Sequence, residues 1–220
     1  MKLPPPSNKL ITFLDTPGHA AFSQMRQRGA KVTDIVVLVV AADDGIMPQT
    51  IEAISHSLKA QVPIIVAINK CDKPGVNPQK IKQDLLRYDI VVEEMGGEIP
   101  AVHISGKTGL GLQELEETIL ALAEVADYRG DPFGPTEGIV VEAKHTKQFG
   151  PVATIIVKRG TLKPGDILVA GNAWCKVKRM IDEYGRNLME VQPSGPVEVL
   201  GWKLLPEAGD LVLESDTEVR

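Results

Sequence analysis

Apolar runs and amphipathic stretches alternate along the first part of the chain. Residues 11–15, 35–42 and 63–69 are apolar runs typical of strands. The second of them is uninterrupted and rich in β-branched residues, which predicts a strand that is fully buried. Pro48 can occupy the first turn of a helix, which we expect to run to about Ala60.

The same alternation continues to about residue 125. Pro78 opens a polar helix that we expect to run through Leu85, and residues 101–105 are typical of a short strand. Residues 112–125 carry apolar side chains at helical spacing, with glutamates on the opposite face. Strands that alternate with helices in this way predict a parallel α/β sheet.

A segment dense in Gly and Pro, residues 129–135, precedes a different pattern. After it, short alternating strands recur with Gly and Pro turns between them, and no long helix is indicated. We expect strands at residues 139–143, 152–158, 167–170, 175–181, 197–202 and 211–213. This second pattern favours a small antiparallel β-barrel.

Composition narrows the classes of protein. The 220 residues suffice for one large or two modest domains. The net charge of −5 argues against binding of nucleic acid by the whole surface, so an RNA partner would need a local basic patch. Two cysteines, Cys71 and Cys175, cannot form a disulfide framework or a four-ligand zinc site, and they fit a reducing compartment. The longest apolar run is too short to span a bilayer, and the first residues lack an apolar signal core.

The first motif with chemical potential is Asp15-Thr16-Pro17-Gly18-His19, at the end of the first expected strand. Nucleotides bind at the carboxyl ends of strands in an open α/β sheet. An Asp there can hold Mg²⁺ through water, a Gly can offer its N–H to a γ-phosphate, and a His can position an attacking water. The alternative is a strand-to-helix turn that Asp15 or Thr16 caps.

A second motif, Asn69-Lys70-Cys71-Asp72, follows another expected strand. An Asp carboxylate can accept both N1–H and N2–H of guanine, a pair of donors that adenine does not offer. The Asn can hydrogen-bond the base, and the Lys stem can lie across the ring. The alternative is a polar loop in which Asn and Asp are turn residues. We expect Cys71 to be a spacer that faces the core.

The third motif, Ser105-Gly106-Lys107, ends the next strand, where a backbone N–H could meet guanine O6. Residues 101–108 read AVHISGKT, which is one residue away from a phosphate-binding loop. Ala101 replaces the first Gly of that loop and lies in an expected strand, so we do not expect phosphate binding there. No complete GxxxxGK[ST] motif precedes the other two motifs.

Together these motifs resemble those of translational GTPases. The continuation of the first motif, with Ala20-Ala21-Phe22 and Met25-Arg26, resembles bacterial and organellar translation initiation factor two. Residues 159–171 resemble the β-barrel of the family's second domain. The resemblance implies an α/β plus all-β protein. We expect a partial P-loop-type G domain at residues 1–130, without its phosphate loop and switch I, a linker at 131–137 and a domain II β-barrel at 138–220.

The resemblance also assigns roles. His19 would be the catalytic residue and Asp15 would hold Mg²⁺ through water. The implied ligands are GTP or GDP with Mg²⁺ in the full-length protein. The implied GTP-binding set comprises Asp15, Thr16, Pro17, Gly18, His19, Asn69, Lys70, Cys71, Asp72, Ser105, Gly106 and Lys107.

By the same resemblance, the chain would be part of a factor that binds and hydrolyses GTP while promoting initiator tRNA binding and ribosomal subunit joining. The full-length factor would be a GTPase, whereas this chain alone would bind nucleotide weakly or not at all. Its partners would be both ribosomal subunits and, through domains not present here, initiator formyl-methionyl tRNA. We expect a monomer with no membrane partner. Cys71 resembles mitochondrial members, which favours the mitochondrial matrix, with the bacterial cytoplasm as the alternative.

Two other functions stay open. The chain could be a fragment of another translational GTPase, such as an elongation factor. It could also be a non-enzymatic ribosome- or RNA-binding module. We expect Trp174 and Trp202 to pack in the barrel rather than stack on bases, and His56, His103 and His145 show no ligand spacing. The basic residues available to such a module are Arg26, Arg28, Lys31, Lys176, Lys178 and Arg179.

Overall fold

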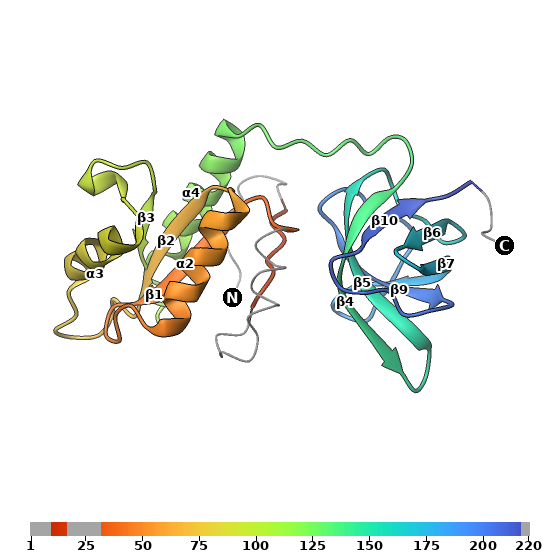
Figure 1. Ribbon diagram of the computed structural model, residues 1–220, viewed down its shortest axis with the longest axis horizontal. Helices are drawn as coiled ribbons and strands as arrows, with labels where there is room; N and C mark the ends of the chain where they lie inside the picture. Colours follow the sequence, from red (N-terminus) through yellow and green to blue (C-terminus); the bar gives the residue numbers. More distant parts are fainter. Residues whose placement is uncertain (1–9, 17–31, 217–220) are drawn as a thin grey trace. The chain divides into compact units, whose positions relative to one another are not determined.

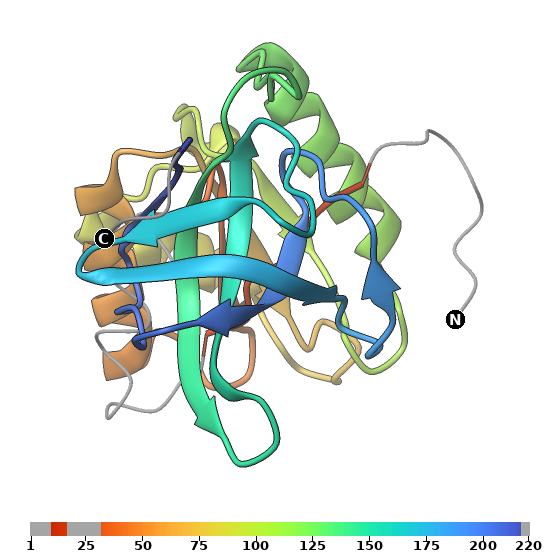
Figure 2. The same cartoon turned by 90° about the vertical axis from the view of Figure 1, so that its right-hand side faces the viewer.

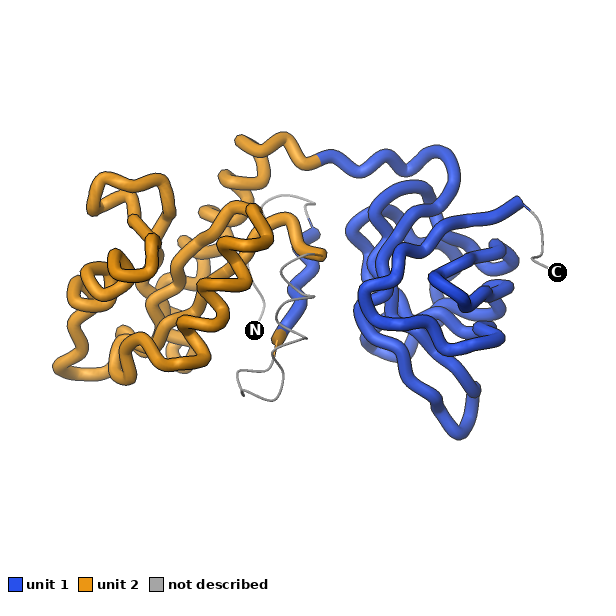
Figure 3. Tube along the Cα trace, viewed as in Figure 1, with its two compact units in different colours: residues 1–15, 129–220 blue, residues 16–128 orange. Residues whose placement is uncertain are grey.

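A computed structural model describes residues 10–16 and 32–216 (Figure 1). The chain divides into two compact units, one of residues 16–128 and one of residues 1–15 with 129–220 (Figure 3). Expectations for Pro17, Gly18 and His19, and for the basic residues before residue 32, lie outside the described residues.

The first unit contains a parallel sheet of strand order β1-β2-β3. The three predicted helices are confirmed, and α2 lies alongside β1 (Figure 1). Two short 3₁₀ helices, η2 (Leu86–Tyr88) and η3 (Glu93–Met95), follow α3. The sheet and its main helices are β1 (Val36–Ala41), α2 (Pro48–Ala60), β2 (Ile64–Asn69), α3 (Pro78–Leu85), β3 (Ala101–His103) and α4 (Leu112–Val125).

The middle strand is the most buried element of this unit. Residues 64–68 of β2 are all buried, as expected for a parallel strand that is covered on both faces. One face packs with Ile54 of α2 and with Ile81 and Leu85 of α3. The helical spacing of apolar residues therefore gives each helix an apolar face that packs on the sheet.

Two strand predictions for the first 42 residues are wrong. Residues 35–42 are not fully buried, because Leu38 and Val40 are buried while Val39 is 54% exposed. Val39 points to the opposite face of the sheet from these two residues, and that face is left exposed at this position. Residues 11–15 do not form a strand. A strand needs a hydrogen-bonded partner, and the three-stranded sheet pairs with none of these residues.

The second unit is an antiparallel β-barrel (Figure 2). Its strand order is β6-β10-β4-β5-β9-β7, and pairing of β6 with β7 closes the ring, while the short β8 extends β7. The six predicted strands are confirmed, and β8 was not predicted. The bounds are β4 (Glu137–Thr146), β5 (Gly150–Arg159), β6 (Ile167–Ala170), β7 (Ala173–Ile181), β8 (Asn187–Leu188), β9 (Pro196–Trp202) and β10 (Leu211–Glu214).

Alternate residues of the barrel strands point inward and fill the interior, among them Ile155, Leu168 and Met180. Trp202 is buried in this core, and Trp174 is half-buried with the Lys203 ammonium 5.6 Å from its ring centroid. The prediction that both tryptophans pack in the barrel is confirmed.

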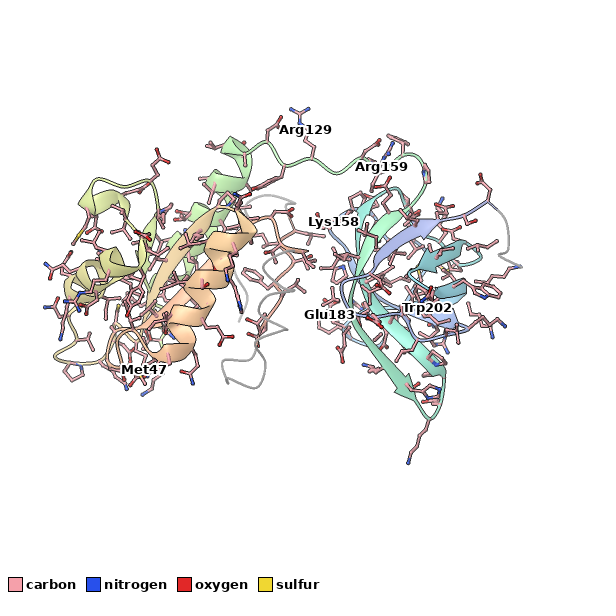
Figure 4. All side chains as sticks on the ribbon, viewed as in Figure 1. Met47, Arg129, Lys158, Arg159, Glu183 and Trp202 are labelled. Carbon is pink, nitrogen blue, oxygen red and sulfur yellow. The ribbon has the colours of Figure 1, made fainter. Side chains whose placement is uncertain are left out.

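The segment that precedes the barrel is fixed to it. Gly160 N–H donates to the carbonyl of Asp131 at 2.8 Å, and the Thr161 hydroxyl donates to the carbonyl of Pro132 at 2.8 Å. Arg159, labelled in Figure 4, contacts the carboxylates of Asp131 and Glu137. The chain from Asp131 onward is therefore held by the barrel. In the described parts of both units, no helix combines the length and apolar character needed to cross a membrane.

Candidate guanine-nucleotide site

Two predicted motifs lie side by side at one edge of the parallel sheet. Ile68 of β2 is in register with His103 of β3, so the loops that follow both strands leave the sheet at the same level. The first loop contains residues 69–72 and the second contains residues 105–107. This edge, beyond the carboxyl ends of the strands, is where open α/β sheets bind ligands.

The Asn69 side chain ties the two loops together. Its Oδ1 accepts from the backbone N–H of Lys70 at 2.7 Å and from the backbone N–H of Gly106 at 3.0 Å. The backbone N–H of Cys71 adds a bond to the carbonyl of Ile104 at 3.1 Å. Asn69 Oδ1 is therefore a brace between the loops, and the hydrogen bond of this side chain to a base stays a prediction.

Asp72 is an exposed carboxylate at the mouth of this pair of loops. A hydrogen bond from the Ser105 hydroxyl lowers the pKa of the Asp72 carboxyl, with help from the charges of Lys107 and Lys73. Ser105 itself is buried, and its Oγ also accepts from the Thr108 backbone N–H at 3.2 Å. The site thus presents an ionised group that can only accept hydrogen bonds, held by a buried hydroxyl.

Cys71 faces the interior, as predicted. Its Sγ donates to the carbonyl of Ile68 at 3.2 Å, and the side chain packs against the apolar core of the unit. Burial raises the pKa of the thiol. Cys71 is therefore a neutral spacer that lets the residues on either side of it face the site.

Lys70 has two carboxylate partners that the sequence motifs did not predict. Its Nζ lies 2.8 Å from Asp43 Oδ1 and 2.7 Å from Asp44 Oδ2. Lys73 also pairs with Asp43. The two lysines hold the pKa of Asp43 well below its usual range, and the two acids raise the pKa of Lys70. The available signal was the Asp-Asp pair directly after an apolar run.

Of the remaining predicted residues, Pro17, Gly18 and His19 lie outside the described part of the chain. Asp15 belongs to the other compact unit, and Thr16 is the first residue of this one. Within residues 10–16 and 32–216, no group of three or more His, Cys, Asp or Glu side chains could hold a metal ion. Residues 101–103 form β3, so the backbone of AVHISGKT lacks the turn that a phosphate loop needs at its first position.

The basic residues of the barrel have local partners. Nε and one terminal nitrogen of Arg179 donate to Asn187 Oδ1 at 3.2 and 2.7 Å, and its guanidinium lies 5.8 Å from the ring centroid of Phe149. Lys178 is exposed on the same strand. These contacts do not favour RNA binding by the basic residues over their being part of an ordinary solvent-exposed surface.

A parallel sheet with guanine-type loops, followed by a closed barrel, defines the class of translational GTPases. The chain belongs to the family described as "Elongation factor Tu GTP binding domain", whose model matches residues 4–125. Residues 135–215 match the family described as "Elongation factor G domain 2".

Similar proteins include initiation factors from mitochondria and bacteria. Mitochondrial translation initiation factor IF-2 of Mus musculus is 58% identical over 98% of this chain and 30% of its own length. Translation initiation factor IF-2 of Parvibaculum lavamentivorans is 58% identical over 97% of this chain and 24% of its own length. The chain thus spans less than a third of either relative.

Solved structures support the fold. GDP-bound aIF5B from Aeropyrum pernix matches 87% of this chain and 42% of its own, with a TM-score of 0.75 and 21% identity. Elongation factor SelB from Methanococcus maripaludis, in complex with the GTP analogue GPPNHP, matches 92% of this chain and 46% of its own, with a TM-score of 0.69 and 24% identity.

Proposed function

We propose that this chain is the guanine-recognition and barrel portion of an IF-2-type translation initiation factor that binds and hydrolyses GTP. The observation that carries the proposal is the pair of braced loops, with the ionised Asp72 at their mouth. Identity above 50% with IF-2 over nearly the whole chain supports the choice of factor. Of the functions considered, initiation is favoured over elongation for this reason.

The residues present fit a guanine base. Asp72 can accept N1–H and N2–H together, which is a charge-assisted bidentate pair. The Gly106 N–H is engaged by Asn69. We therefore assign the donor to guanine O6 to the next backbone N–H of that loop, at Lys107. The aliphatic stem of Lys70 would lie against one face of the ring.

The phosphate side of the proposed site depends on other residues. We propose that Asp15 holds Mg²⁺ through water, since a carboxylate oxygen is a ligand that this ion prefers. His19 would position the attacking water, because phosphoryl transfer is catalysed by placement and charge stabilisation. Thr16, Pro17 and Gly18 would complete this side. We expect weak nucleotide binding by the chain alone, since no phosphate-loop sequence contributes to it.

The partners and compartment follow from the relatives. Because the chain resembles IF-2, we propose that the whole factor acts on both ribosomal subunits and on initiator tRNA. The similar proteins include mitochondrial and bacterial factors. We propose the mitochondrial matrix, with the bacterial cytoplasm as the alternative.

The test replaces the Asp72 carboxylate, which only accepts hydrogen bonds, with an amide that both donates and accepts. In Asp72→Asn the new amide can donate to the 2-oxo group of xanthine, but it no longer accepts two guanine donors. We expect GDP affinity to fall about 30-fold or more and XDP to become the preferred ligand. Calorimetry with Mg²⁺ and NMR shifts of residues 69–72 and 105–107 would measure both affinities.

Asp84→Asn is the matched control, since it removes the same charge from a partly exposed position on α3. It should leave GDP binding unchanged. Equal binding of GDP and ADP by the unmodified chain, or no effect of Asp72→Asn, would refute the proposed function.

A further inference from the structure

We propose that Asp43 and Asp44 are positioning residues that hold the side chain of Lys70 ready for the guanine ring. This inference rests on the proposed function. The loop after β1, residues 42–45, has no role in the sequence motifs described above. It nevertheless supplies both carboxylates that contact the Lys70 ammonium.

The parallel register of the sheet brings these groups together. Ala41 of β1 is the partner of Asn69 in β2, and the backbone N–H of Ala42 donates to the carbonyl of Asn69 at 2.8 Å. The loop then turns at once, since Gly45 N–H donates to the carbonyl of Ala41 at 3.0 Å. Residues 43 and 44 are thereby placed beside Lys70, although they are far from it in sequence.

Lys70 is consequently held at both ends. Its backbone N–H donates to Asn69 Oδ1, and its φ of 66° lies in the left-handed region, which non-glycine residues adopt only when the surroundings enforce it. Its Nζ is held by two carboxylates at 2.7–2.8 Å. The stem between these two ends has little freedom left to lose when a base packs against it, which is the general benefit of preorganisation.

An ordinary surface ion pair is the competing explanation, since such pairs contribute little to stability. Two features favour the positioning role. Both carboxylates converge on one ammonium, and Asp43 also pairs with Lys73, so the contact is a network of four charged groups. That network joins the loop after β1 to the loop that carries Lys70, where it fixes the side chain that would cover the base.

The experiment measures GDP affinity of the chain by calorimetry and NMR with Mg²⁺, for Asp43→Asn/Asp44→Asn. We expect about three- to tenfold weaker binding, in line with two exposed ion pairs to one ammonium. Lys73→Met, which spares both contacts to Lys70, should stay within about twofold of the unmodified chain. Asp84→Asn controls for the loss of negative charge.

A double-mutant cycle with Lys70→Met separates positioning from a general structural effect. In the Lys70→Met background the two Asn substitutions should not weaken GDP binding further, because the side chain that they position is absent. The inference would be overturned if the two Asn substitutions still weakened GDP binding in the Lys70→Met background. It would also be overturned if Asp43→Asn/Asp44→Asn bound GDP as tightly as the unmodified chain, or more tightly. In either case Asp72→Asn remains a separate test of the proposed function. If the unmodified chain shows no preference for GDP over ADP, the proposed function and the positioning role both fail.

Discussion

The barrel closes on itself, whereas the parallel sheet leaves one strand open. Each of the six barrel strands has two neighbours within the ring, because β6 pairs with β7. In the described part of the first unit, β1 pairs with β2 alone, and Val39 in that strand is exposed. The contrast shows that an apolar run specifies a strand, while the covering of each face of the sheet decides which of its side chains are buried.

The two units also differ in the charge they bury. The barrel core is apolar, but the first unit encloses Lys82 completely, and its Nζ contacts Glu94. The Lys82 charge also acts on His103 and Cys71, which lie at or near the guanine-type loops. The unit that carries the candidate site thus contains a fully buried charged side chain, whereas the hydrophobic core of the barrel is apolar.

The largest effect should come from a cavity in the barrel. Leu168 is fully buried there, so Leu168→Ala should lower the free energy of unfolding of that unit by about 2–5 kcal/mol. Both tryptophans of the chain, Trp174 and Trp202, belong to the barrel, so their fluorescence reports on it alone. The long helices belong to the other unit, and far-UV circular dichroism follows them.

Urea unfolding should therefore show an earlier fluorescence transition with an unchanged helical transition. Leu211→Ala, at a position that is 67% exposed, is the control and should move neither. If both transitions shift together in Leu168→Ala, the two units do not unfold independently and the comparison between them loses its basis.

A smaller effect is expected at the buried charge of the first unit. Glu94→Gln leaves the Lys82 ammonium without its anion, which should cost about 1–3 kcal/mol, since Glu94 is half-exposed and water can partly replace it. Adding Lys82→Met should recover most of this loss, because an apolar side chain of similar length then fills the space. Urea unfolding followed by far-UV circular dichroism measures the free energy of unfolding of both variants. If Glu94→Gln/Lys82→Met were no more stable than Glu94→Gln, the buried charge would not be the cause of the loss.

Much of the fold followed from local patterns. The bounds of α3 and α4 were predicted to the residue, because Pro78 marks the start of one helix and apolar spacing marks the other. The strand prediction for residues 11–15 failed for a different reason. Apolar character records a tendency to be buried, but it does not say whether a partner strand is present.

The features of the candidate site also fall into those that local sequence predicts and those that depend on strand pairing. Asp72, Ser105 and the spacer role of Cys71 could be predicted, since contiguous motifs carry them. The contacts of Asp43 and Asp44 with Lys70, and of Lys82 with Glu94, could not. They depend on which strands are neighbours and in what register, as with Ala41 and Asn69, and no stretch of sequence encodes that pairing locally.

The last test compares two adjacent residues of β1, and the smallest expected effect is at the exposed one. Val40 is 1% exposed and Val39 is 54% exposed, because they point to opposite faces of the sheet. Val40→Ser should cost about 2–4 kcal/mol through a cavity and a buried hydroxyl. Val39→Ser should stay within about 0.5 kcal/mol of the unmodified chain. Urea unfolding followed by helical circular dichroism gives both values. Equal losses would mean that the face bearing Val39 is covered in solution, and the assignment of that residue to an open face would then be wrong.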